Sequence, residues 1–203
     1  MHINNISLTN YGYVHCESRF YSVWDIIEEN RVFNFTTGVN QLCGDIDSGL
    51  WAISYLLSMY NPSSDNFILM KNADVCVDGE AIPISEILHY SCYMDISYHM
   101  FSTAKPINTI IEDMINNNSN SCSLYEIKDL FELDSERFTR PLSSVGNEIF
   151  RAMAAIAFAA NKEIYCFPWL SKRRYDYYYS QLTWLFDILK NLNKIIILPI
   201  GNG

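Results

Sequence analysis

The sequence has few basic residues, and most of them lie in its second half. Of 203 residues, 14 are Lys or Arg and 23 are Asp or Glu, so the net charge is −9. Residues 1–100 hold three basic residues against twelve acidic ones, whereas residues 101–203 hold eleven of each. Binding to nucleic acid or to an anionic membrane requires clustered Lys and Arg. We therefore expect neither a nucleic-acid partner nor direct membrane binding.

No segment has the composition of a secretory signal or a membrane span. The start, MHINNISLTN, has neither a basic region nor a long apolar stretch, and no run of 18 apolar residues occurs. The six cysteines include no CxxC pair, so their spacing supports neither a zinc ribbon nor a thioredoxin-like motif. We expect a cytoplasmic chain whose cysteines are reduced and mostly buried.

The composition is that of a chain with a large core. Hydrophobic residues make up 49% of the sequence and charged residues 18%, which excludes global disorder. The length fits one domain, since domains commonly run to roughly 100–200 residues. Apolar strands alternate with helices near the C-terminus, which indicates a parallel sheet with crossovers. The fold class is therefore α/β, with antiparallel strands added near the N-terminus.

The apolar pattern predicts the following elements. Strands are expected at residues 3–8 and 11–16, joined at Asn10, and at 32–35, 39–43, 66–71, 74–77, 91–94, 163–167 and 195–198. Helices are expected at 50–60, 84–89, 107–115, 124–130, 144–160 and 177–192. Residues 21–29 are expected to be irregular or a helical turn.

The turn GDIDSGLW, residues 44–51, joins an expected strand to an expected buried helix. Gly44 and Gly49 stand at the two glycine positions of the phosphate-binding pattern G-x-x-x-x-G-K-[ST]. A helix N-terminus favours an anion, but Asp45 and Asp47 place two carboxylates in the turn. These carboxylates can oppose a phosphate, or can occupy the backbone donors as an internal phosphate mimic. The alternative is an ordinary capped helix after a tight turn.

Further segments follow the turn in a fixed order. They are NFILMKNADVCVDGEAIPI, HYSCYMD, LSSVG before a long apolar helix, EIYCFPWLS and IIILPIGNG. Over residues 3–203, in this order and at near-correct spacing, they resemble the nucleotide-binding domain of ABC-type ATPases. The resemblance implies a P-loop NTPase-like fold with a mixed, largely parallel sheet. It also implies a single domain, 1–203, with a small helical subdomain at 96–141.

The resemblance assigns binding roles to individual residues. Tyr21, beside Phe20, precedes the loop where that family keeps its adenine-stacking aromatic residue. Asp95 lies near the position of the family's conserved glutamine. The phosphate-loop positions are Gly44, Asp47, Ser48 and Gly49, and the positions shared with the LSGGQ signature are Ser143 and Gly146.

The signature segment has a functional and an ordinary interpretation. In the family, this segment reaches across a dimer to the other subunit's nucleotide, so LSSVG can complete an active partner's site. The alternative is that Ser143 or Ser144 is the N-cap of the following helix, with Glu148 in its first turn.

The sequence departs from the family wherever a phosphate, a metal or the attacking water is handled. The lysine position is Leu50 and the metal-ligating hydroxyl position is Trp51. The Walker B aspartate and glutamate fall on Phe167 and Pro168, and the switch histidine falls on Ile200 or Gly201. Phosphoryl transfer depends on the positioning and the charge that these groups supply. The resemblance therefore predicts no catalytic residue and no metal site, and it leaves open ATP binding without hydrolysis.

We expect a catalytically inactive, ABC-type subunit that acts in assembly or regulation. Its partner would be a second copy, an ABC-type ATPase or another protein, and it could reach a membrane only through that partner. The alternative is a binding module that reuses the fold for a peptide or a small molecule. The stretch WLSKRRYDYYY, residues 169–179, fits either an interface or an exposed helix start with aromatic packing.

Two weaker patterns point to other chemistry. His89, Cys92, Asp95 and His99 have spacing that could place metal ligands together, although an intervening strand would point alternate residues apart. His15 and Cys16 could belong to a Cys-His nucleophile of an unrelated α/β enzyme.

Overall fold

A four-stranded parallel sheet forms the centre of the computed structural model, which describes residues 2–9, 11–29, 31–70, 74–101 and 104–202. Its strands run in the order β5 (Gly38–Cys43), β11 (Ile195–Ile200), β10 (Ile164–Cys166) and β9 (Ser91–Tyr93). All residues of β9, β10 and β11 are buried. The expected strand junction at Asn10 and the last residue of the strand expected at 66–71 lie outside the described residues.

Two antiparallel sheets are built mainly from the N-terminal part of the chain. One has the order β4 (Val32–Thr36), β1 (Asn5–Thr9), β7 (Asp74–Val77) and β8 (Glu80–Ile82). The other has the order β3 (Ser22–Ile27), β2 (Gly12–Glu17) and β6 (Phe67–Leu69). A turn at Asp78-Gly79 joins β7 to β8, and both of its residues have positive φ, as in the favoured two-residue hairpin turns.

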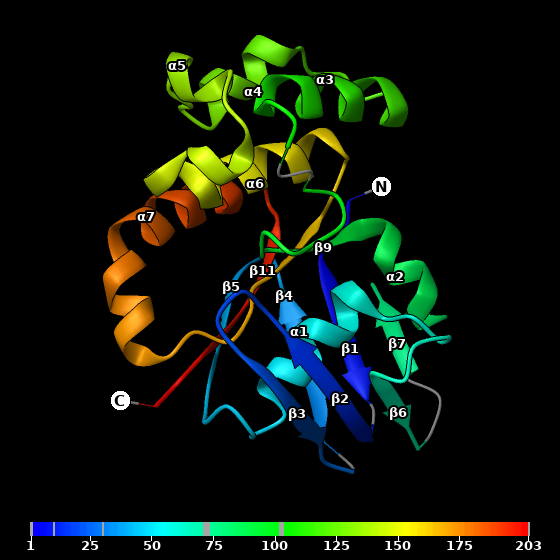
Figure 1. Ribbon diagram of the computed structural model, residues 1–203. Helices are drawn as coiled ribbons and strands as arrows, with labels where there is room; N and C mark the ends of the chain where they lie inside the picture. Colours follow the sequence, from blue (N-terminus) through cyan, green and yellow to red (C-terminus); the bar gives the residue numbers. More distant parts are fainter. Residues whose placement is uncertain (1, 10, 30, 71–73, 102–103, 203) are drawn as a thin grey trace.

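Helix α1 (Leu50–Met59) lies between the parallel sheet and the β3-β2-β6 sheet (Figure 1). It contacts β9, β10 and β11 on one side and β2 and β3 on the other. All its residues except Met59 are therefore buried. A helix covered on opposite sides needs apolar residues all round, which explains why its sequence shows no polar stripe.

The remaining helices lie at increasing distance from the parallel sheet. Helices α6 (Ile149–Ala159) and α7 (Lys172–Asn191) pack together, and α7 also contacts β5 and β11. Figure 1 shows α3 (Ile107–Asn118), α4 (Leu124–Leu130) and α5 (Ser135–Phe138) beyond α6, away from the strands. Helix α2 (Ile84–Tyr90) leads into β9. The boundaries 96–141 for a helical subdomain stay a prediction.

The α/β class, the antiparallel addition and the parallel sheet are confirmed, but three local expectations are wrong. Residues 22–27 form a strand, not an irregular segment. The helix expected at 144–160 begins only at Ile149, after 3-10 turns at Leu142–Ser144 and Gly146–Glu148. The last helix begins at Lys172, because the Ser171 hydroxyl caps it by accepting from the Arg174 backbone N–H.

All six cysteines are unpaired. Only three are buried, two are partly buried and Cys43 is exposed, so the expectation that most of them would be buried holds for half of them. Among the described residues, no helix is long and apolar enough to cross a membrane.

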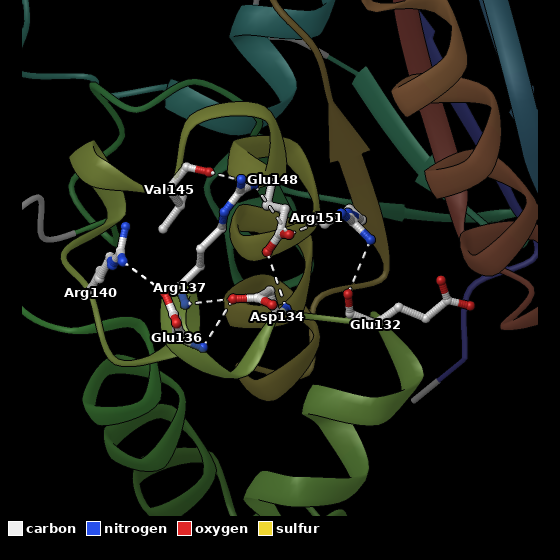
Figure 2. A network of polar contacts seen from close by, with 8 residues as sticks. All are labelled: Glu132, Asp134, Glu136, Arg137, Arg140, Val145, Glu148 and Arg151. Carbon is white, nitrogen blue, oxygen red and sulfur yellow. Dashed lines mark hydrogen bonds and ion pairs between the residues drawn. The ribbon is translucent and has the colours of Figure 1, made fainter.

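A buried carboxylate ties the start of α6 to the helices above it. Figure 2 shows Glu148 between the side chains of Arg137 and Arg151, each 3.3 Å from its Oε1. Glu148 Oε2 also accepts from the Asp134 backbone N–H at 3.2 Å. Arg151 in turn donates to the Glu132 carbonyl. One carboxylate therefore connects α6 with the chain that leads into α5.

We expect Glu148→Ala to lower the free energy of unfolding by about 1.5–3 kcal/mol, because it removes hydrogen bonds to a buried charged group. Urea unfolding followed by circular dichroism measures this loss. The matched control is Glu136→Ala, whose carboxylate is 82% exposed and pairs with Arg140. The control should cost no more than about 1 kcal/mol. Equal losses in both variants would contradict the structural role given to Glu148.

Candidate functional site

The loop between β5 and α1 lies at the carboxyl ends of the parallel strands, where open α/β folds bind their ligands. The Gly44 backbone N–H donates to the Ile200 carbonyl at 3.0 Å, which ties the loop to the end of β11. Gly49, the last loop residue, has φ +81 and precedes the first turn of α1. The loop therefore places the free N–H groups of a helix N-terminus at the ligand-binding edge of the sheet.

A buried carboxylate accepts from two of the N–H groups at this helix start. Asp25 Oδ1 accepts from the Gly49 backbone N–H at 2.8 Å, and its Oδ2 accepts from the Ala52 backbone N–H at 2.9 Å. Asp25 Oδ1 also accepts from its neighbour Ile26 at 3.0 Å, and the residue has no exposed surface. Asp25 belongs to β3, so an anion of the chain itself is bound at the N-terminus of α1.

The backbone of β3 closes the loop from the same side. A Cβ atom at Gly49 would lie 2.3 Å from the Ile26 carbonyl oxygen, closer than any real Cβ contact. Only glycine fits here, because the position needs both a positive φ and this close approach. Gly49 therefore serves the contact with β3.

The environment of Asp25 acts on its charge in two opposing directions. Burial raises the pKa of the carboxyl above its ordinary range, because it disfavours the charged form. The backbone N–H groups of Ala52, Gly49 and Ile26 oppose that effect. These donors and the positive end of the α1 dipole are the groups that would otherwise stabilise an external anion.

The carboxylate that binds these N–H groups is Asp25 of β3, and not Asp45 or Asp47 of the loop as the sequence suggested. Asp45 and Asp47 are exposed, and the loop serine donates its hydroxyl to the Asp45 carbonyl. The expectation that Asp45 or Asp47 would take the place of a phosphate on the backbone donors is therefore wrong, because Asp25 holds the Gly49 and Ala52 donors. The available signal was the alternation of residues 22–27, in which Asp25 shares a face with Ile27.

Aromatic side chains fill the space around the loop. The Trp51 indole N–H donates to the Tyr93 hydroxyl at 3.0 Å, and that hydroxyl donates to the Glu17 carbonyl at 2.9 Å. The Trp169 indole N–H donates to the Gly44 carbonyl at 3.0 Å. The position of a metal-ligating hydroxyl is therefore occupied by an indole that is bonded into the core.

The positions that the resemblance assigns to metal and water chemistry are apolar here. Phe167 is fully buried between Phe150 and Phe186, and its carbonyl accepts from the Ser54 hydroxyl at 2.6 Å. A Cβ at Gly201 would lie 2.7 Å from the Trp169 ring. No group of three or more His, Cys, Asp or Glu that could hold a metal ion occurs among the described residues.

Tyr21 packs against the aromatic side chains around the loop, and its expected role as an adenine-stacking residue stays a prediction. Its ring packs edge-on against Trp169 and Trp51, with centroids 5.4 and 6.5 Å apart. Arg174 Nε donates to its hydroxyl at 3.3 Å. Partial burial acts to raise the pKa of Tyr21, but hydrogen bonds with Ser171 and Arg174 and the Arg174 charge lower it below its ordinary value. The structure therefore joins Tyr21 to the loop and to the start of α7.

Asp95 is buried and bound by the chain itself. It accepts from the Arg19 backbone N–H and from the Ser97 hydroxyl, and the Arg19 guanidinium lies 3.8 Å away. Its carboxylate is therefore committed to neighbouring residues.

The two signature positions lie on the exposed turns before α6. Ser143 and Gly146 are exposed, and Gly146 has φ +57 with open space around it. The N-cap of α6 is Glu148, without a side-chain cap, so the capping role considered for Ser143 and Ser144 is wrong. The structure places these residues on an accessible surface.

The overall fold resembles that of solved structures. No protein-family model and no curated protein matches the sequence. Among solved structures, a putative ABC transporter ATP-binding protein from Pyrococcus furiosus superposes with a TM-score of 0.63 at 16% identity, covering 98% of this chain and 90% of that one. An ATP-binding cassette in a dimeric, post-hydrolysis state with ADP and Pi gives 0.57 at 12% identity, covering 98% and 88%. The chain therefore has the fold of ABC ATP-binding domains.

We expect Asp25→Ala to lower the free energy of unfolding by about 1–3 kcal/mol, because it leaves buried N–H donors without their acceptor. Asp47→Ala, in the loop itself, is the control and should change stability by no more than about 0.5 kcal/mol. Urea unfolding measures both. An Asp25→Ala protein as stable as the Asp47→Ala protein would show that the carboxylate does not hold the loop.

Proposed function

We propose that this protein is a non-catalytic subunit with the fold of ABC ATP-binding domains, and that it acts by assembling with a partner protein. The observation that carries the proposal is the Asp25 carboxylate on the Gly49 and Ala52 N–H groups. A phosphate group at the same place would meet a carboxylate in a buried environment. The Gly49 and Ala52 donors are therefore taken by the chain itself and do not fit a nucleotide phosphate.

The surrounding residues support the same proposal. Leu50 and Trp51 offer neither the ammonium nor the hydroxyl that a bound phosphate and its magnesium require, and both are buried. Phe167 offers no carboxylate to a metal. Because Leu50, Trp51 and Phe167 replace the groups that bind phosphate and metal, the features left to support a function are the surfaces of the protein. Ser143 and Gly146 on their exposed turns are one place where such a subunit could contact a partner's nucleotide site.

The purified chain should not hydrolyse ATP in the presence of Mg²⁺, and MgATP should leave its melting temperature unchanged. A ligand at 100 times its Kd would add about 2.7 kcal/mol, or roughly 5–11 °C for a chain of this size. An active ABC ATP-binding domain, assayed in parallel, is the positive control. Metal-dependent hydrolysis by this chain would overturn the proposal, and a rise of several degrees without hydrolysis would show that the loop still binds nucleotide.

A second function, binding of a peptide or a small molecule, is favoured by one cleft. A cleft of about 480 Å³ is lined by Tyr21, Ser171, Arg173, Arg174, Tyr177 and Tyr178. The Arg174 guanidinium lies 3.7 Å above the Phe20 ring, whereas Arg173 makes no ion pair with the described residues. Two arginines among tyrosines suit a ligand that combines an aromatic ring with an anion.

Phenyl phosphate is the probe for this cleft. We expect it to bind more tightly than inorganic phosphate, and Arg173→Ala to weaken it at least about tenfold, the effect of one charge-assisted contact. Lys190→Ala, near the other end of α7, is the control. Isothermal titration calorimetry measures the affinities. Equal affinities for the two variants would exclude this cleft as the binding site.

A further inference from the structure

The outer face of the β3-β2-β6 sheet carries a group of exposed apolar side chains. Trp24 is 48% exposed, Ile68 51% and Met70 62%, and Tyr13 and Ile26 are each 40% exposed. We call these five residues the apolar face. Isolated exposed apolar residues are ordinary, but a contiguous group is a mark of an interaction surface.

The strand register makes the apolar face contiguous. Tyr13 is paired directly with Ile26 on β3 and with Ile68 on β6, so one row of three apolar side chains crosses the sheet. In the next row, His15 is paired with Trp24, and their rings lie 5.0 Å apart. Directly paired residues on one face have neighbouring side chains.

The opposite face of the same sheet is fully used by the core. Val14, Cys16 and Ile27 are buried there, and β2 and β3 contact α1. Figure 1 shows β2 and β3 on the outer side of α1, with no helix drawn over them in that view. The apolar face is therefore not one side of a core that another described element completes.

Acidic residues surround the apolar face. Glu17 ends β2, Glu28 and Glu29 follow β3, and Asp65 precedes β6; all four are exposed. The two basic residues of the described part of the first hundred are engaged elsewhere. Arg19 lies beside Asp95, and Arg31 lies over the Phe33 ring, 4.7 Å from its centroid. Within the described residues, the charges at the rim of the apolar face are thus acidic.

We propose that the apolar face binds a partner protein through an amphipathic segment whose apolar side is flanked by Lys and Arg. The centre of such an interface is apolar and aromatic, and complementary charge at the rim gives specificity. A second copy fits poorly, because a two-fold interface would bring two acidic rims together. This inference rests on the proposed function, because that function requires a partner protein and the inference names the surface that would bind it.

The probe is an amphipathic helical peptide of Leu and Lys, compared with a Leu and Glu peptide of the same pattern. Neither peptide contains tryptophan, so a change in the protein's tryptophan emission, to which the exposed Trp24 contributes, reports binding, and a Trp24→Phe variant identifies its share. We expect the Lys peptide alone to bind, and Ile68→Ser with Met70→Ser to weaken it at least tenfold. Tyr125→Ser removes a side chain that is 71% exposed on α4 and is the matched control, which should bind as the wild type does.

A second variant tests the charge without touching the apolar residues. Glu28→Lys with Asp65→Lys should also weaken the Lys peptide at least tenfold. Binding unaffected by both double variants, or equal binding of the Glu peptide, would overturn the proposal. Self-association of the wild type that Ile68→Ser with Met70→Ser abolishes would overturn it too, because the occupant would then be a second copy. These outcomes leave the proposed function intact, since that fails on hydrolysis of ATP.

Discussion

The hydrogen bonds from the N-terminus of α1 to the Asp25 carboxylate organise the centre of this molecule. They join β3 to the helix that lies between two sheets, and they do so at the edge where the parallel strands end. Burying a carboxylate is costly unless its oxygens are hydrogen-bonded, and here three backbone donors meet that need. The same contact gives the Gly49 and Ala52 N–H groups at the helix N-terminus an acceptor from the chain itself.

The position of Asp25 also determines what β3 presents to solvent. Side chains alternate along a strand, so placing Asp25 and Ile27 inward turns Trp24 and Ile26 outward. A strand that buries its carboxylate and exposes its indole reverses the usual arrangement. The internal anion at the loop and the apolar face on the outside are therefore two consequences of one register.

Sequence reasoning predicted the elements in which hydrophobicity and burial agree. Strands β10 and β11 are buried throughout, and helix α1 is mostly apolar and buried except at Met59, so their apolar pattern was sufficient. Strand β3 was missed because one of its buried positions is Asp25, and a charged residue is expected at the surface. The bounds 177–192 began α7 too late because KRRYD is polar, whereas the alternative of an exposed helix start within residues 169–179 agrees with the Ser171 cap. The order of the segments indicated the fold. The carboxylate that binds the loop, Asp25, comes from a strand that is distant in the sequence, so no local spacing could predict the contact.

The acceptor bound by the loop is the Asp25 carboxylate of the same chain, so any other anion must compete with it for the same donors. A free phosphate loses translational and rotational freedom on binding, whereas the Asp25 carboxylate is already held in place by the pairing of β3 with β2. A phosphate that took the place of Asp25 on the Gly49 and Ala52 N–H groups would have to displace a hydrogen-bonded carboxylate. The carboxylate can leave those donors only if its side chain or its strand moves, and β3 is paired with β2 along its whole length, from Ser22 to Ile27. The strand pairing therefore opposes the displacement of Asp25.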